Sequence, residues 1–359
     1  MEVRLKNISK VYNSNIYAVK NLSNLFESKK FTVLLGPSGC GKTTVLRMIA
    51  GLEKITEGYL YLGDNIANDI PPKKRNIAMA FQRFTMYPGM NVYQNIAFPL
   101  EIKRIEKDKI KEKIDKLSKI LKINDLLNRI PDQVSGGEAQ RIALARMLVR
   151  EPNICLMDEP LSSLDAKLRI ELRSEIKNIH LNNPRTTIFV THDQEEAMSL
   201  GEQIVVMDKG EIIQQGVPDE IFNNPKNVFV GTFLGLPTMN IIKCNYDDNL
   251  NVFYTYENSF LLNCSTDVNK KYIKYIGIRP ENIKLNKNKL DKYYIACKIL
   301  VIENLGNKYL YTVEALNQNI KVICKDNKNI DIGQKCFLKF DENSIYCFDN
   351  KKENLSNGN

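Results

Sequence analysis

The chain has 359 residues, of which 43% are hydrophobic, so we expect two domains with ordinary packed cores. No stretch approaches the roughly 20 apolar residues of a membrane span and the N-terminus has no apolar signal core, which predicts a cytosolic chain or one held at a membrane by a partner. The formal charge of +9 comes from lysines spread among acidic residues, which argues against nucleic-acid binding. Eight cysteines without a C-x-x-C pair accompany only two histidines, which argues against a zinc site and a disulfide framework.

Residues 1–235 alternate short apolar runs with amphipathic helical patterns, which predicts an α/β domain built on a largely parallel sheet. Three runs predict buried strands that end in polar residues: FTVLLG (31–36), NICLMDEP (153–160) and TTIFVTHD (186–193). We expect a helix in TTVLRMIAGL (43–52), and a hairpin with Asp-Lys-Gly at its turn in IVVMDKGEIIQQG (204–216).

The pattern becomes helical between about residues 83 and 150, and strand-like after residue 235. Apolar residues on one face of a helix indicate a helical insertion between strands of the α/β core; they are Ile110, Ile114, Leu117 and Leu121. Short β-like runs separated by turn residues predict an all-β domain over residues 236–350. The polar tail, residues 351–359, is expected to be disordered.

The stretch GPSGCGKT (36–43) matches G-x-x-x-x-G-K-[ST] in full, between a predicted strand and a predicted helix. In such a loop, backbone N–H groups curl around phosphate oxygens, and the helix N-terminus adds positive potential. We expect Lys42 to reach the β- and γ-phosphates and the Thr43 hydroxyl to bind Mg²⁺. A glycine-rich turn without a ligand is the alternative, and the order of strand, loop and helix argues against it. The candidate nucleotide-binding residues here are Gly36, Pro37, Ser38, Gly39, Cys40, Gly41, Lys42, Thr43 and Thr44.

Two carboxylates come directly after the predicted buried strand ICLM. Because P-loop proteins hold Mg²⁺ with an acid at a strand end, we expect Asp158 to bind the metal and Glu159 to orient or deprotonate the attacking water. Without the phosphate loop, two solvated loop carboxylates would be the preferred interpretation. His192 ends another predicted strand; a single histidine is more often structural, but its place beside the predicted site indicates a hydrogen bond to the γ-phosphate or the water.

The stretch VSGGEAQRIALAR (134–146) runs from a serine and two glycines directly into a helical pattern. Ser135 and Glu138 fit the capping box S-x-x-E, so a well-capped helix is expected. Capping does not explain Gly136 and Gly137, because each glycine costs about 1 kcal/mol in a helix relative to alanine. Both are explained if an anionic ligand must approach the backbone at this helix N-terminus.

This stretch resembles the signature motif of the ATP-binding-cassette (ABC) ATPases. The other family landmarks occur in order along residues 1–235: GPSGCGKTT, AFQRF, the signature, ICLMDEP, LSSLD and VTHD. The resemblance implies that Tyr12 stacks on adenine and that Gln82 contacts both Mg²⁺ and the helical subdomain. It also places Asp165, together with Glu138, among the nucleotide-binding residues.

The resemblance further implies a head-to-tail homodimer with two ATP molecules at the interface, closed by ATP binding and reset by hydrolysis. The phosphate loop of one copy would face Ser135, Gly136 and Gly137 of the other. The stretch THDQEEAM resembles ATPases of binding-protein-dependent importers, and GIRPENI (277–283) resembles their carbohydrate subgroup. Membership of that subgroup implies a small OB-like C-terminal domain used for regulation and dimer contacts. The implied setting is the cytoplasmic face of the cell membrane, with two integral-membrane permease subunits, an extracellular solute-binding protein reached through the permease, and no nucleic acid.

Some positions depart from the family pattern without removing a catalytic group. Val134 and Glu138 stand where leucine and glutamine are usual, Ser163 where asparagine is common, and Gly89 where histidine is frequent. Two alternatives stay open: an importer ATPase for another solute, such as a polyamine, iron or another anion, and a soluble cassette protein acting on ribosomes or DNA. The solute itself is not encoded in this chain, because the permease and the binding protein would select it.

Overall fold

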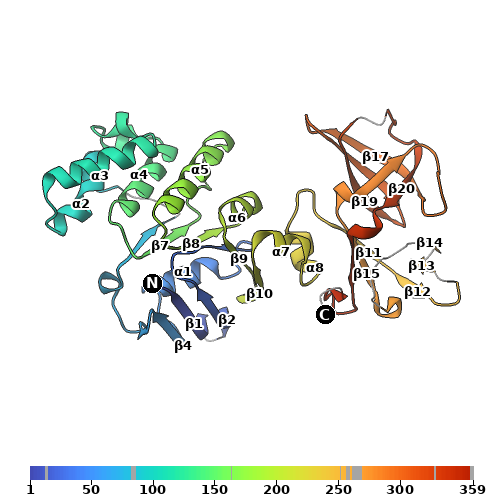
Figure 1. Ribbon diagram of the computed structural model, residues 1–359, viewed down its shortest axis with the longest axis horizontal. Helices are drawn as coiled ribbons and strands as arrows, with labels where there is room; N and C mark the ends of the chain where they lie inside the picture. The colour runs from blue at the N-terminus through green and yellow to red at the C-terminus, as the bar shows by residue number, and fades with distance from the viewer. Residues whose placement is uncertain are drawn as a thin grey trace. The chain divides into compact units, whose positions relative to one another are not determined.

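A computed structural model describes residues 1–12, 15–81, 86–162, 164–250, 252–255, 259–260, 269–326 and 329–355. The chain divides into two compact units, Met1–Asp219 and Glu220–Asn359 (Figure 1). Among the described residues, no helix combines the length and the apolar character needed to cross a bilayer. Short 3₁₀ turns lie at Pro72–Lys74, Asn124–Leu126, Pro131–Gln133, Lys270–Tyr272, Pro280–Asn282 and Glu342–Ser344.

A six-stranded sheet forms the centre of the first unit. Its order is β10 (Glu211–Gly216), β9 (Gln203–Asp208), β3 (Phe31–Leu35), β8 (Thr186–Thr191), β7 (Ile154–Asp158) and β6 (Ile77–Ala80). All neighbouring pairs are parallel except the hairpin of β9 and β10, in which Asp208 pairs with Glu211. Every residue of β3, β7 and β8 is buried, as expected for parallel strands covered on both faces. The predicted buried strands and the hairpin are confirmed.

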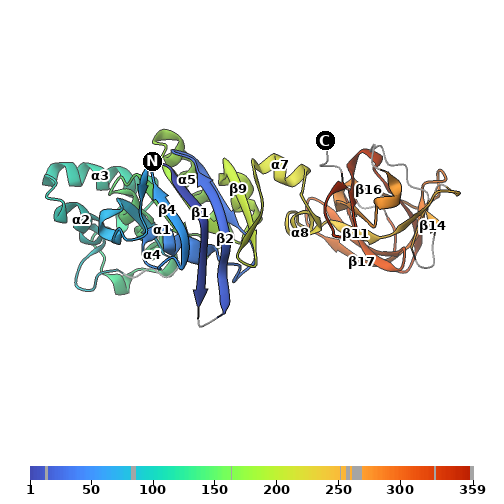
Figure 2. The ribbon, with the colours of Figure 1, turned by 90° about the horizontal axis from the view of Figure 1, so that it is seen from below.

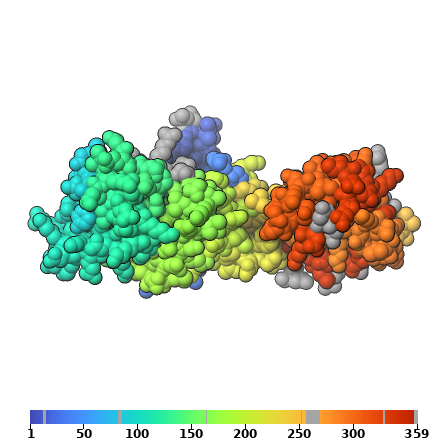
Figure 3. All heavy atoms as spheres, turned by 90° about the horizontal axis from the view of Figure 1, so that it is seen from above, coloured from blue at the N-terminus to red at the C-terminus, as the bar shows by residue number. Residues whose placement is uncertain are grey.

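Helices cover this sheet and extend from one side of it. The sequence places α1 (Lys42–Ala50) after β3, α5 (Ala166–Asn182) after β7, and α6 (Gln194–Leu200) after β8. Three further helices enter between β6 and β7, namely α2 (Val92–Ile102), α3 (Lys107–Ile120) and α4 (Gly136–Leu148). The predicted helical insertion is therefore confirmed, and its teal surface abuts the green segment that includes α5 (Figure 3).

A second, antiparallel sheet in this unit was not predicted from the sequence. Its order is β2 (Ile16–Phe26), β1 (Val3–Tyr12), β4 (Glu57–Leu62) and β5 (Asn65–Ile66). Residues Val3, Leu5 and Ile8 of β1 are buried in one cluster with apolar residues of α1. Register shifts interrupt β1 after Leu5 and Ile8, so its apolar residues do not keep a period of two, which hid the strand from pattern analysis.

The second unit is built from antiparallel strands after two short helices, α7 (Pro218–Asn223) and α8 (Val228–Phe233). One sheet has the order β11 (Asn240–Lys243), β15 (Tyr275–Ile278) and β21 (Ile345–Phe348). A second has β12 (Asn245–Asp247), β13 (Val252–Tyr254) and β14 (Ser259–Phe260). The third has β16 (Ile283–Asn286), β20 (Lys335–Phe340), β17 (Ile295–Asn304), β18 (Tyr309–Ala315) and β19 (Gln318–Cys324). The strands of this unit curl around one another (Figure 2), and apolar residues from all three sheets form one core, in agreement with the expected OB-like β-domain.

Arg279, in the stretch GIRPENI, ties the two short helices to this β-domain. Its side chain is 2% exposed, and its guanidinium donates to the carbonyl oxygens of Leu234 at 2.7 Å and of Phe222 at 2.6 Å. The guanidinium carbon also lies 3.6 Å from the centre of the Phe222 ring. The segment from residue 220 therefore belongs to the C-terminal unit, whereas sequence composition placed the change of domain at residue 235.

The start of the polar tail, expected to be disordered from residue 351, is paired with the second unit. Glu353 forms a backbone bridge with Asn227, and Asn354 forms one with Phe348. The Asn354 side-chain amide also donates to the carbonyl oxygen of Pro225 at 2.8 Å. Residues 356–359 lie outside the described residues.

Candidate functional site

The phosphate loop lies between the end of β3 and the start of α1, and packing explains two of its glycines. Gly41 is the N-cap of α1 and has φ of 104°, a left-handed conformation that favours glycine. A Cβ at Gly41 would lie 2.3 Å from the carbonyl oxygen of Ala18, and one at Gly36 would lie 2.3 Å from that of Met207. The loop backbone therefore packs directly against β2 and β9, which leaves no room for a side chain at these two positions.

Lys42 and Thr43 connect this loop to its surroundings. The Lys42 ammonium donates to the carbonyl oxygens of Gly36 and Pro37, both at 2.8 Å, and the side chain is 4% exposed. The Thr43 hydroxyl donates to Oδ1 of Asp158 at 2.8 Å, so the end of β7 meets the start of α1. Burial raises the pKa of Asp158, and the hydrogen bond from Thr43 acts in the opposite direction.

A cavity of about 330 Å³ opens above the loop. It is lined by Ala18, Ser38, Gly39, Gly41, Lys42, Thr43, Thr44 and Glu159. The structure thus brings Glu159 to the loop. Asp158, which directly precedes Glu159, is 115 residues from Thr43 along the chain. Ala18 was missed by sequence analysis, because it lies on β2 in the unpredicted sheet and carries no chemical signal.

Glu159 and His192 form a pair beside this cavity. Oε2 of Glu159 lies 3.3 Å from Nδ1 of His192, and the histidine side chain is half exposed. Glu159 has φ of 46°, an uncommon left-handed conformation for a non-glycine residue, and its N–H donates to the carbonyl oxygen of Val190 at 3.0 Å. The turn is therefore held against β8, which carries the histidine at its end. Gln82, the third predicted catalytic residue, lies outside the described residues.

Tyr12, the expected adenine-stacking residue, ends β1 and is 38% exposed. Its hydroxyl donates to Oε2 of Glu53 at 2.9 Å, and the Lys10 ammonium lies 4.9 Å from the centre of its ring. Lys10 in turn pairs with Glu53 at 2.6 Å. Burial raises the pKa of the Tyr12 hydroxyl. The ring is thus oriented by two charged neighbours, but it is not among the residues that line the loop cavity.

The signature stretch forms the predicted capping box at the start of α4. The Ser135 hydroxyl accepts from the N–H of Glu138 at 3.3 Å, and the Glu138 carboxylate accepts from the N–H of Ser135 at 2.8 Å. That backbone hydrogen bond lowers the pKa of Glu138. A Cβ at Gly137 would lie 3.1 Å from Leu164, whereas one at Gly136 would meet nothing within 4 Å. Packing within the described chain therefore leaves only a tight space for a side chain at Gly137 and does not explain Gly136.

The predicted nucleotide-binding residues fall into two groups within one copy of the chain. Ser135, Gly136 and Gly137 are not among the residues that line the cavity above the phosphate loop. Asp165 is the N-cap of α5, where its Oδ1 accepts from the N–H of Leu168 at 3.0 Å. Within one copy of the chain, the phosphate loop and the start of α4 therefore do not line the same cavity.

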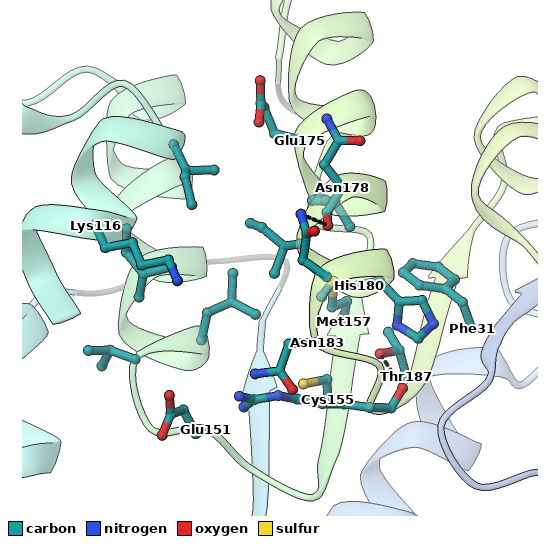
Figure 4. Close-up of a pocket in the computed structure, with 18 of the residues that line it drawn as sticks. Phe31, Lys116, Glu151, Cys155, Met157, Glu175, Asn178, His180, Asn183 and Thr187 are labelled. Carbon is teal, nitrogen blue, oxygen red and sulfur yellow. Dashed lines mark hydrogen bonds between the residues drawn. The ribbon is translucent and has the colours of Figure 1, made fainter.

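A second cavity, of about 720 Å³, lies between α3 and α5 (Figure 4). Residues of three strands of the central sheet also line it, namely Phe31, Cys155, Met157 and Thr187. Its walls carry apolar side chains: Leu117, Ile120, Leu148, Ile176 and Ile179. An ion pair between Lys113 and Glu151, at 2.5 Å, connects α3 with the segment before β7. Sequence analysis did not find this cavity, because its residues come from three helices and three strands and from the loops that follow them.

Comparison with known proteins agrees with this geometry. A family model described as ABC transporter matches residues 19–162, and one described as TOBE domain matches residues 276–348. The chain is 40% identical to the oligosaccharides import ATP-binding protein MsmX of Bacillus subtilis (strain 168), with 98% of each chain covered. It is 38% identical to the trehalose/maltose import ATP-binding protein MalK of Thermococcus litoralis, with 97% of each covered.

A solved structure shows the same cassette. It is the dimeric post-hydrolysis state of the ATP-binding cassette MJ0796 bound to ADP and Pi, which matches with a TM-score of 0.56 and 31% sequence identity. The match covers 60% of this chain and 98% of that one. The order of motifs along residues 1–235 and the all-β domain after them therefore both have counterparts in known proteins.

Proposed function

This chain belongs to the ABC transporter family and is an ATP-binding ABC ATPase, and we propose that it energises the import of a sugar or a related organic solute. The observation that carries the proposal is the cavity above the phosphate loop, where Lys42, Thr43 and Glu159 meet. The sugar class is supported by MsmX and MalK, sugar-import proteins that are similar to this chain over nearly its whole length.

The chemistry of the site is governed by its charges. The loop N–H groups and Lys42 stabilise negative charge on the β- and γ-phosphates, and Glu159 orients the attacking water and accepts its proton. His192, 3.3 Å from Glu159, holds the carboxylate and hydrogen-bonds the γ-phosphate or the water. The paired oxygens of Thr43 and Asp158 fit Mg²⁺, which prefers oxygen ligands; these two residues would hold the ion, and it would supply neutralisation of phosphate charge. Gln82 is the further metal ligand expected from the sequence.

A second copy of the chain completes the site in this proposal. Gly136 at the start of α4 is exposed, and a Cβ there would meet no atom within 4 Å from the described parts of the chain beyond its own neighbours and helix turn. A helix N-terminus of this kind binds anions, so it suits the γ-phosphate of ATP held by the partner copy. The dimeric state of the MJ0796 cassette supports this arrangement.

The cavity between α3 and α5 supports a membrane partner. Its lining combines apolar side chains with polar and charged ones such as Lys116, Asn178 and Arg185, which suits a short amphipathic helix, such as a cytoplasmic helix of a permease subunit. Because the cavity lies between the helical subdomain and the sheet, a helix bound there would sense any movement between them. Together with the similarity to the import proteins MsmX and MalK, this cavity supports a proposed location at the cytoplasmic face of the membrane, with two permease subunits that receive solute from an extracellular binding protein.

The test is a pull-down from detergent-solubilised native membranes with tagged Glu159→Gln, trapped by ATP and Mg²⁺. We expect two polytopic permease subunits to co-purify, and their identity would indicate the solute. The matched control is the Glu159→Gln chain carrying Ser135→Arg, which should not close around ATP and should retain less permease. A partner set of ribosomal or DNA-bound proteins, without membrane proteins, would leave the ATPase intact and overturn the transport role.

A further inference from the structure

The residues on both sides of His192 are fixed by a buried network. Glu196 on α6 is 3% exposed, and its Oε2 accepts from the Thr191 hydroxyl at 2.6 Å. The same hydroxyl accepts from the N–H of Asp193 at 2.9 Å. Oδ1 of Asp193 caps α6 by accepting from the N–H of Glu196 at 3.1 Å. His192 therefore leaves β8 between two residues whose positions depend on the start of α6.

Arg169 on α5 joins this network to the segment that carries Asp165. One terminal nitrogen, Nη1, donates to Oδ2 of Asp193 at 3.2 Å, and Nε lies 3.9 Å from Oε1 of Glu196. The other terminal nitrogen, Nη2, donates to the carbonyl oxygen of Leu164 at 3.1 Å, directly before Asp165. A forked guanidinium can make these contacts at once, whereas a single ammonium group cannot.

We propose that Arg169 is a positioning residue for ATP hydrolysis, which sets His192 relative to the segment containing Asp165. Arg169 is not among the residues that line the loop cavity, so it acts through other side chains rather than on the nucleotide. The interaction connects the elements that come after β7 and β8, and both strands end at the site. The inference rests on the proposed role of His192 in hydrolysis.

The neighbouring Arg173 provides a matched control on the same helix. It also joins α5 to α6, through a contact of 3.5 Å between its Nη1 and Oε2 of Glu195. The Glu195 side chain is 73% exposed, so solvent screens this pair. Arg173→Gln should therefore leave kcat within twofold of wild type, although it also removes one positive charge, one helical turn after Arg169 on α5.

The experiment measures steady-state ATP hydrolysis and equilibrium ATP binding by the purified full-length chain. We expect Arg169→Gln to lower kcat by about tenfold to a hundredfold, the effect of losing hydrogen bonds to a charged group. ATP affinity should change less than twofold, because the phosphate loop is untouched. Arg169→Lys keeps a positive charge beside Asp193 and Glu196, which protects the fold, and we expect it to lose at least fivefold in kcat. Wild-type kcat in Arg169→Lys would overturn the proposal.

A double-mutant cycle with His192→Ala separates positioning from a general structural effect. If Arg169 acts through His192, Arg169→Gln should change kcat less than twofold in the His192→Ala background. Equal losses in both backgrounds would overturn the inference while leaving the proposed site intact. Wild-type turnover in His192→Ala alone would overturn the role of His192 and the inference with it.

Discussion

Replacing Arg279 with leucine should lower the melting temperature of the C-terminal unit by about 15 °C. The substitution removes two charge-assisted hydrogen bonds, at 2.7 and 2.6 Å, and leaves the carbonyl oxygens of Leu234 and Phe222 without them. Each orphaned group costs about 1 to 3 kcal/mol, so the loss is about 4 kcal/mol in total. For a unit of this size, about 1 kcal/mol corresponds to roughly 4 °C.

Differential scanning calorimetry of the full-length chain measures this effect. ATP and Mg²⁺ should raise only the transition of the unit that holds the phosphate loop, which identifies the other transition as that of the C-terminal unit. Lys284→Leu, on an exposed position of β16, is the control and should shift that transition by about 2 °C at most. A shift below about 3 °C in Arg279→Leu would show that the guanidinium does not hold α7 and α8 to the β-domain.

Three further substitutions test the site. Glu159→Gln should keep ATP affinity and lower kcat at least 100-fold, or about 2.7 kcal/mol, in a phosphate-release assay; turnover within threefold of wild type contradicts its role. Ser135→Arg should preserve nucleotide binding but abolish the ATP-dependent dimer in light scattering, with Ser135→Thr as the control; a dimer that still forms with ATP refutes the arrangement. Asp158→Asn should abolish turnover yet raise the melting temperature of the nucleotide-free chain at pH 7. Burial raises the pKa of Asp158 in the folded chain above the ordinary value of 3.8, so the folded chain holds this proton more tightly than the unfolded chain. The contribution of Asp158 to the free energy of unfolding is therefore largest below pH 3.8 and falls as the pH rises. The asparagine variant should therefore lose less stability than wild type from pH 4 to 7, and an equal loss would contradict this reasoning.

The fold was predictable wherever one local pattern carried the signal. Runs such as FTVLL and ICLMD identified parallel strands, because a short strand that is covered on both faces is apolar at nearly every position. The antiparallel sheet of β1, β2, β4 and β5 was missed, because bulges break the alternation of β1 and because β1 also pairs with β4, which follows only after β2, β3 and α1. The position at which the C-terminal unit begins was also missed, because it depends on the contacts of Arg279 with Phe222 and Leu234, which are distant from it in sequence.

For the site, the sequence by itself determined which groups are chemically available. The phosphate loop, the acids at the end of β7 and the capping box at Ser135 are local features, since each is set by residues within about one turn or loop. Only the tertiary structure decided which of these groups meet. It placed Thr43 against Asp158 and Glu159 against His192. It also left the start of α4 outside the cavity above the phosphate loop. Contacts between distant segments depend on how strands order within a sheet, and that order is fixed by the packing of the whole domain rather than by any short stretch.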